Sequence, residues 1–424
     1  MHASDPLRFW ARTLSRDGWL LFAACGVRNF AYGFLSVVLG VYLSTLGLSV
    51  EAIGGIFTAS LAGGAAMTLM LTSVADRLGR RQILLLGAAL MAAAGVVFAL
   101  TDQVIVLTLA AVLGTISPSG KEVGPFLSVE QAILPQTTSD ARRTEVFAAY
   151  NLVNYLATAL GALVVGVPAL LGLSTLQGYL LLIWGYAAVG VVLLLLFAAL
   201  SPAVEAGGGV GQRTSRPSLG LRESRGTVAK LATLFAVDSF AGGFVVQGLL
   251  ALWFYLRYGF DVGELGAVFF GTNLLAALSF LAAPGLARRF GLLNTMVFTH
   301  LPSNVLLLLV PLMPSAELAV AVLLIRYSLS QLDVPTRQSY TMAIVPPEER
   351  AAAAGIFSVA RNAAAAIAPA FAGITLAVPA VGLPFIVAGG LKIAYDLTIF
   401  AVFRGVQPPE ERARVGAVTA ATHR

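Results

Sequence analysis

The stretch LAVAVLLIRYSLSQLDVPTRQSYTMAIV occupies residues 318–345 and is long and apolar enough to cross a bilayer, which takes about 20 residues. It nevertheless carries Arg326, Asp333 and Arg337. At 100° per residue these three lie within about 40° of one another on a helix. A charge at the centre of a membrane costs about 2.5–3.5 kcal/mol even on a lenient insertion scale. The three side chains are therefore predicted to face a watered cavity that the rest of the chain lines.

The overall composition is that of a membrane protein. Apolar residues make up 58% of the chain and charged residues 11%, with a mean hydropathy of +0.85; a soluble domain carries about 25% charged residues. The single cysteine, Cys25, excludes a disulfide framework and a cysteine-based metal cluster. The net charge of +6 is expected to reflect membrane topology, not a nucleic-acid surface. We therefore expect the lipid bilayer as surroundings, no nucleic-acid partner and no cofactor.

Twelve apolar runs recur along the chain in two groups of six. The first group covers residues 19–45, 52–74, 82–101, 104–134, 146–171 and 176–200. The second group covers residues 228–256, 264–287, 292–314, 317–345, 352–378 and 383–404. Between them, a stretch rich in Gly, Ser and Arg is typical of a flexible linker. The sequence predicts an all-α integral membrane protein with an N-terminal six-helix lobe at 1–200, a linker at 201–226 and a C-terminal six-helix lobe at 227–424.

The distribution of Lys and Arg predicts the orientation. If the N-terminus is cytoplasmic, most of the 27 basic residues fall in cytoplasmic loops, the linker or the tails. Arg257 alone lies near an outer loop. This bias is the positive-inside pattern. We expect a multi-pass protein of the cytoplasmic membrane with both termini cytoplasmic. Basic residues inside the predicted spans are Arg28, Lys121, Arg326, Arg337, Arg361 and Lys392.

The two halves of the chain repeat each other. The segment ADRLG at 75–79 matches ARRFG at 287–291, an offset of half the chain, and VRNFAYGF at 27–34 matches VDSFAGGF at 237–244. An even number of spans in each half predicts a parallel repeat, related by an axis along the membrane normal. The lobes are therefore expected to be pseudo-symmetric.

The segment TSVADRLGRR at 72–81 resembles the loop 2–3 signature of the major facilitator superfamily, G-x-x-x-D-R-x-G-R-R, with Thr72 in place of the first Gly. The resemblance implies twelve helices in two rocking lobes and the activity of a secondary transporter. It also implies that Asp76 belongs to a conformational latch and meets a basic residue of loop 4–5. Candidate latch residues are Asp76, Arg77, Gly79, Arg80, Arg142 and Arg143, with inverted charges in the second half at Arg288 and Glu348.

Spans 1 and 7 carry opposite charges at matching positions. Arg28 and Asp238 each lie about ten residues, roughly 15 Å, into their helices. In the major facilitator fold these spans face each other across the cavity, which predicts an Arg28–Asp238 contact. The contact either changes with the transport state or is a permanent pair that makes insertion tolerable.

Spans 4 and 10 also match, with Glu122 corresponding to Asp333. Pro and Gly residues in SPSGKEVGP at 117–125, and Pro335 in span 10, predict broken helices. The two carboxylates either respond to the arrival of a proton or form closed pairs, Glu122 with Lys121 and Asp333 with Arg337. Glu130 is expected nearer the cytoplasmic surface and is the weaker candidate.

Two further groups of polar residues lie inside predicted spans. Asn151 and Asn154 form a polar stripe on span 5 that either lines the cavity or bonds a neighbouring helix. Lys392 and Asp396 are four residues apart on span 12 and are predicted to neutralise each other. The candidate substrate or proton-coupling residues are Arg28, Tyr32, Lys121, Glu122, Asn151, Asn154, Asp238, Arg326, Asp333, Arg337 and Arg361.

No enzyme is expected, because phosphate-binding, zinc-protease and nucleophile-elbow motifs are absent and His2, His300 and His423 are scattered. The leading hypothesis is proton-coupled export of a small organic solute by a monomer, with Glu122, Asp238 and Asp333 titrating. The alternative is an organic-anion carrier that binds a carboxylate or phosphate through buried arginines. A third hypothesis is a membrane sensor that transports nothing; it predicts closed ion pairs without a solvated cavity.

Overall fold

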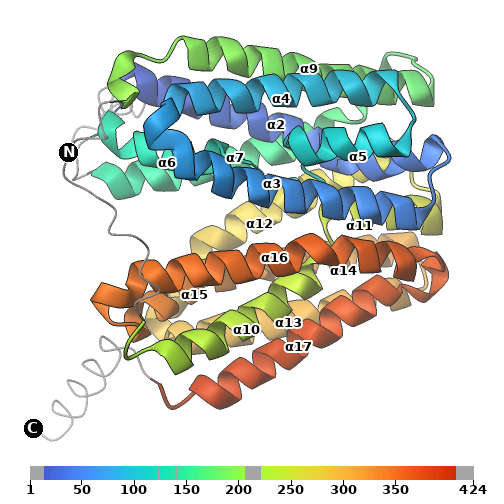
Figure 1. Ribbon diagram of the computed structural model, residues 1–424. Helices are drawn as coiled ribbons and strands as arrows, with labels where there is room; N and C mark the ends of the chain where they lie inside the picture. The colour runs from blue at the N-terminus through green and yellow to red at the C-terminus, as the bar shows by residue number, and fades with distance from the viewer. Residues whose placement is uncertain (1–13, 123, 139–141, 206–220, 407–424) are drawn as a thin grey trace, which may run out of the picture. The chain divides into compact units, whose positions relative to one another are not determined.

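The computed structural model describes residues 14–122, 124–138, 142–205 and 221–406, and within these ranges it is helical and free of strands (Figure 1). The α-helices of the first half are α2 (Arg16–Thr45), α3 (Val50–Leu78), α4 (Arg80–Leu100), α5 (Val104–Leu113), α6 (Phe126–Ile133), α7 (Arg143–Val164), α8 (Val167–Leu170) and α9 (Thr175–Ala198). Those of the second half are α10 (Arg225–Gly243), α11 (Gln247–Tyr258), α12 (Val262–Phe290), α13 (Leu292–Leu309), α14 (Ala316–Leu329), α15 (Asp333–Ile344), α16 (Arg350–Leu376) and α17 (Leu383–Phe403).

In the described residues, eleven helical segments are long and apolar enough to cross a membrane. The twelfth predicted span, 104–134, is interrupted: α5 ends at Leu113 and α6 begins at Phe126. Span 10 is also interrupted, between α14 and α15. Both breaks confirm the prediction from proline and glycine. They also place Glu122 in non-helical chain and Asp333 at the first residue of α15.

Side chains at the helix ends explain where several helices begin. The Ser15 hydroxyl accepts a hydrogen bond from the Gly18 N–H at 3.3 Å, which caps α2, and Ser315 caps α14 in the same way. Gly79 and Gly291 precede α4 and α13 with φ of 95° and 86°, a conformation that side chains with a Cβ rarely adopt. The repeated glycine therefore ends one span and starts the next in each half.

By their contacts the described residues form two compact units. Unit 1 comprises those within Met1–Arg213, Val246–Asn273 and Pro369–Ala377, and unit 2 comprises the remainder. The predicted domain boundary at 201–226 lies partly outside the described residues, and it stays a prediction.

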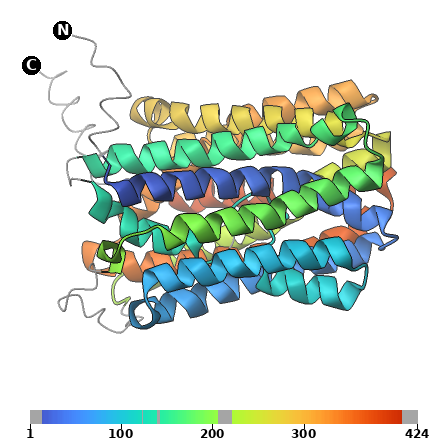
Figure 2. The same ribbon diagram turned by 90° about the horizontal axis from the view of Figure 1, so that it is seen from above.

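In unit 1, α2 packs against α7 and α9, and these helices lie side by side in both views (Figures 1 and 2). The approach of α2 to α7 is backbone to backbone: a Cβ at Gly33 would lie 2.2 Å from the Thr158 carbonyl oxygen, and one at Gly161 would lie 2.0 Å from that of Phe30. Close packing of small residues is how helices associate within a membrane. It holds Arg28 against the irregular segment after α5.

In unit 2, α17 packs against both α10 and α13, and α13 also contacts α14 and α15. An aromatic group fixes this arrangement, with the Phe235 ring centroid 5.2 Å from that of Phe357 and 6.4 Å from that of Tyr395. The same packing brings polar side chains from α10, α13, α15 and α17 together in the interior of the unit.

Candidate functional site

Unit 1 contains a buried cluster in which one arginine binds two glutamates. Arg28 donates from Nε to Glu122 Oε1 at 2.7 Å and from Nη2 to Glu122 Oε2 at 3.3 Å. It also donates from Nη1 to Glu130 Oε1 at 2.8 Å and from Nη2 to Glu130 Oε2 at 2.7 Å. Bidentate pairs of this kind are the strong charge-assisted hydrogen bonds. We call Arg28, Glu122 and Glu130 the α2 cluster.

The broken fourth span positions the two glutamates. Glu122 lies in the non-helical segment and Glu130 in α6, so they reach the guanidinium from two directions. The Phe126 ring lies under the guanidinium, 4.6 Å from its carbon, and Tyr150 of α7 donates to Glu130. The Glu130 side chain is 0% exposed and bonded to Arg28, and its expected depth near the cytoplasmic surface stays a prediction.

The α2 cluster has more carboxylates than cations. With both glutamates ionised it carries a net charge of −1, and with one protonated it is neutral. The side chains of Arg28 and Glu130 are 0% exposed and that of Glu122 is 7% exposed, so water compensates little of this charge. Burial of an uncompensated charge costs free energy. A single proton would therefore remove the imbalance.

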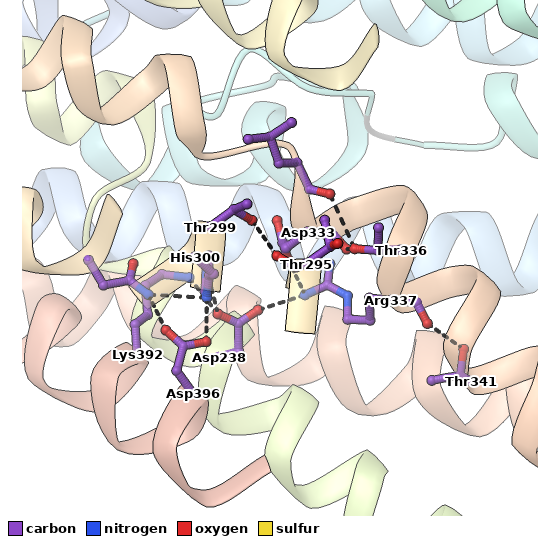
Figure 3. Close-up of polar contacts among 12 residues, drawn as sticks. Asp238, Thr295, Thr299, His300, Asp333, Thr336, Arg337, Thr341, Lys392 and Asp396 are labelled. Carbon is purple, nitrogen blue, oxygen red and sulfur yellow. Dashed lines mark hydrogen bonds and ion pairs between the residues drawn. The ribbon is translucent and has the colours of Figure 1, made fainter. Parts of the chain in front are cut away.

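Unit 2 contains a larger cluster centred on Asp238 of α10 (Figure 3). Lys392 of α17 donates to Asp238 Oδ1 at 2.5 Å, and Arg337 of α15 donates to Asp238 Oδ2 at 3.1 Å. Arg337 Nη1 is also 3.1 Å from Asp333 Oδ2, one helical turn earlier. We call Asp238, Asp333, Arg337, Lys392, His300 and Asp396 the α10 cluster.

His300 and Asp396 form the other end of the α10 cluster. The His300 Nδ1 is 2.8 Å from Asp396 Oδ1, and Asn304 Nδ2 donates to Asp396 Oδ2 at 2.8 Å. The prediction that Lys392 and Asp396 neutralise each other is therefore wrong. Each has a partner on another helix, Asp238 for Lys392 and His300 for Asp396 (Figure 3).

The stripe predicted for span 10 is only partly formed. Asp333 and Arg337 make the expected contact four residues apart. Arg326 lies on α14, before the break, so the regular helical register that aligned it with Asp333 is lost. Its guanidinium lies over the Tyr327 ring, 4.7 Å from the centroid, and its side chain is buried.

The remaining predicted cavity residues lie in different surroundings. Arg361 of α16 is half-buried and interacts electrostatically with Arg337, Asp238 and Asp333. Tyr32 is fully buried beside Tyr186, with ring centroids 6.5 Å apart. The others lie near the α2 cluster in sequence or on α7: Lys121 is exposed, and Asn151 and Asn154 are half-buried. The predicted Arg28–Asp238 contact would join the two units, and it stays a prediction.

At the predicted latch, backbone groups are held by carboxylates that the sequence analysis did not single out. Glu205 accepts from the backbone N–H groups of Arg80 and Arg81, at 2.7 and 2.9 Å, beside Gly79. The side chains of Asp76, Arg77 and Arg143 lie outside the described residues. Arg288 and Glu348 are exposed, and Arg142 is half-buried. The latch itself stays a prediction.

A second such carboxylate belongs to Glu349, next to the predicted Glu348. It accepts from the N–H groups of Arg222, Glu223 and Ser224 just before α10, at 2.5, 3.0 and 3.1 Å. The pKa of Glu349 is lowered to about 2 because hydrogen bonds stabilise its ionised form. The Ser224 hydroxyl makes the largest contribution, and these backbone N–H groups add to it. Glu349 therefore fixes the start of the helix that carries Asp238.

Sequence reasoning ranked Glu130 too low and missed His300 and Asn304, for a common reason. Glu130, His300 and Asn304 have their important partners on helices distant in sequence. A signal for the pair in α13 was available: His300 and Asn304 are polar, four residues apart and inside an apolar run, which puts them on one helix face.

Comparison with known proteins agrees with this helical arrangement. A family model for the Major Facilitator Superfamily matches residues 21–331. An uncharacterized membrane protein of Saccharomyces cerevisiae is 28% identical over 425 residues, covering 92% of this chain and 95% of that protein. The crystal structure of the nucleoside transporter NupG superposes with a TM-score of 0.74 at 16% identity, over 92% of this chain and 99% of that one. A D-xylose-proton symporter gives 0.69 at 15% identity, over 90% and 97%. The all-helical membrane fold is the expected one, with eleven candidate membrane helices in the described residues.

Proposed function

We propose proton-coupled transport of a small organic solute for this chain, which belongs to the major facilitator superfamily and is a multi-pass secondary transporter. The observation that carries the proton coupling is the α2 cluster, where two buried glutamates share one arginine. Uptake of one proton neutralises the cluster, and its release restores the charge. A change of buried charge alters the relative stability of two conformations, which is what coupling requires.

Glu122 is the better proton acceptor of the two. Glu130 receives two bonds from Arg28 and one from Tyr150, and it is fully buried. Glu122 keeps 7% of its side chain exposed, and its Oε2 accepts two long contacts, from Arg28 Nη2 and Asn29 Nδ2, each at 3.3 Å. Its accessibility and weaker bonding support a role as the carboxylate that exchanges protons.

Purified protein in liposomes loaded with a pH-sensitive dye tests this function. A panel of nucleosides, pentoses, organic acids and organic cations is added, and the internal pH is followed alongside the uptake of labelled solute. The nucleoside and pentose are included because two proteins of similar fold are named for such solutes. We expect at least one solute to be transported together with proton movement, in either direction.

Glu122→Gln should abolish the proton movement while solute exchange at equal pH persists. The matched control is Asp102→Asn, which changes an exposed carboxylate outside both clusters and should leave coupling intact. Solute transport by the wild-type protein without any proton movement would contradict the proposal.

A second function, organic-anion transport, is favoured by Arg361. Its half-buried guanidinium lies inside an apolar helix, and no carboxylate forms an ion pair with it among the described residues. Such an arginine can bind a carboxylate or phosphate bidentately. If this function holds, Arg361→Gln abolishes uptake of the organic acids in the panel, and Glu122→Gln leaves that uptake unchanged.

We also propose that both termini and the 201–226 linker are cytoplasmic, from the distribution of basic residues. To test this, cysteines are introduced in the linker and in the 258–263 connection, and intact cells are treated with a thiol reagent from outside. The native Cys25 is buried and should stay unreactive. The connection should react and the linker should not; the opposite result would reverse the topology.

A further inference from the structure

We propose that His300 Nε2 in unit 2 binds and releases a second proton, whose movement is required for coupling together with the one at Glu122; this inference rests on the proposed proton-coupled function. His300 lies in the interior of the α10 cluster, on a helix that packs against both α14 and α17 (Figure 3). The inference follows from what each ring nitrogen faces.

The Nδ1 side of the ring is committed to Asp396. An ionised carboxylate only accepts hydrogen bonds, so the 2.8 Å contact with Asp396 Oδ1 requires the proton on Nδ1. Asn304 Nδ2 also lies 3.1 Å from Nδ1, but with Asp396 ionised Nδ1 is the donor in its own contact and cannot accept, so the amide donates to Asp396 Oδ2 at 2.8 Å. Asp396 is 0% exposed, so water does not replace these bonds. The neutral ring therefore carries its proton on Nδ1 and leaves Nε2 with a lone pair.

The Nε2 side faces a second carboxylate. Nε2 is 3.9 Å from Asp238 Oδ1, too long for a hydrogen bond but within the range of an ion pair. In the neutral ring a lone pair faces an anionic oxygen, which is unfavourable. A proton on Nε2 converts this contact into an attraction, so Nε2 is a vacant proton site between two carboxylates.

The proton would also change the bonds of a neighbouring helix. Asp238 Oδ1 is the same oxygen that accepts from Lys392 Nζ at 2.5 Å. A protonated His300 competes with Lys392 for it, which weakens the tie between α10 and α17. Protonation at one atom thus redistributes contacts among α10, α13 and α17.

The charges around His300 determine how its protonation changes the net charge of the α10 cluster. Within the α10 cluster three carboxylates face two permanent cations, Arg337 and Lys392, so with a neutral histidine the cluster carries a net charge of −1. Protonation of His300 changes the net charge by one. The buried or half-buried charged and titratable groups of the packed helices include Asp238 on α10, Arg326 on α14, Asp333 and Arg337 on α15, Arg361 on α16, and Lys392, Tyr395 and Asp396 on α17.

The first test observes the imidazole directly and needs no substrate. The chain has three histidines, so His2→Gln with His423→Gln leaves His300 as the single source of signal. Solid-state NMR of this variant, labelled with ¹⁵N-histidine in lipid, reports which nitrogen carries a proton. As the pH falls from about 8 to about 5, Nδ1 should stay protonated while Nε2 gains a proton. Asp396→Asn should remove the preference for Nδ1. A neutral ring protonated on Nε2, or a ring unchanged across this range, would overturn the inference.

The second test separates this inference from the function on which it rests. His300→Gln is measured in the dye-loaded liposomes with the panel solute that moves most protons in the wild type. Proton movement should fall to the level of protein-free liposomes while solute exchange persists. Thr299→Val, a neighbour on α13 bonded to the Thr295 carbonyl, is the control and should keep coupling. Unchanged proton movement in His300→Gln would refute only the role of His300. Absence of proton movement in the wild-type protein would refute the proposed proton-coupled function.

Discussion

The α2 cluster and the α10 cluster solve the burial of charge in different ways. In the α2 cluster a single cation, Arg28, binds both carboxylates, so both ion pairs depend on one side chain. In the α10 cluster Asp238 has two cationic partners, Lys392 and Arg337, and Arg337 in turn has two carboxylates. The ion pairs of the α2 cluster therefore depend on one residue, whereas those of the α10 cluster are redundant.

The difference extends to what each cluster can do with a proton. In the α2 cluster a proton has to bind a carboxylate that Arg28 already holds. In the α10 cluster His300 Nε2 lies beside Asp238 and makes no hydrogen bond among the described residues. We infer that the α2 cluster exchanges a proton by loosening an existing pair, whereas the α10 cluster does so by forming a new one.

The largest effect expected from this comparison is that of Arg28→Met. Removal of one partner from a buried ion pair costs about 3–5 kcal/mol, because the remaining charge is left buried. Here two glutamates lose their cation at once. Thermal unfolding can be followed with a thiol-reactive dye, since Cys25 is the only cysteine and its side chain is buried.

The control for Arg28→Met removes the stranded charges as well. The combination of Arg28→Met with Glu122→Gln and Glu130→Gln should recover most of the lost stability. If the free energy of unfolding of Arg28→Met lies within about 1 kcal/mol of that of the wild type, the α2 cluster does not depend on this one cation.

A smaller effect is expected from Lys392→Met. Asp238 keeps Arg337 at 3.1 Å, so the loss should be that of one charge-assisted hydrogen bond, about 1–3 kcal/mol. Lys230→Met changes an exposed lysine of α10 and should have almost no effect. The same dye measurement ranks these variants, and a cost for Lys392→Met equal to that of Arg28→Met would refute the redundancy.

The sequence predicted most of the fold and pointed to most residues of the two clusters, but it missed His300 and few of the pairings were foreseen. Apolar runs report membrane spans directly, and Pro335 together with the segment around Glu122 reported the two breaks. Asp333 with Arg337 was predictable because both partners share a helix. Spacing along a helix could not show that Lys392 prefers Asp238 to Asp396, since that choice depends on how α10 and α17 pack. The break after α14 likewise removed Arg326 from its expected alignment.

The smallest effect concerns Glu349, which anchors the chain just before α10 in unit 2 as Glu205 anchors the start of α4 in unit 1. The pKa of Glu349 is about 2 in the folded chain, below the value of about 4.3 for an unperturbed glutamate. A lowered pKa means that the ionised side chain stabilises the folded state above pH ~4.3, and that this contribution is lost as the pH falls toward 2.

Glu349→Gln should therefore lower Tm at pH 7, by less than Lys392→Met does, and the difference from the wild type should shrink at lower pH. Tryptophan fluorescence during heating measures both proteins from about pH 7 to about pH 3. The exposed neighbour provides the control, because Glu348→Gln should match the wild type throughout. A difference that grows as the pH falls would show that Glu349 does not act through its ionised carboxylate.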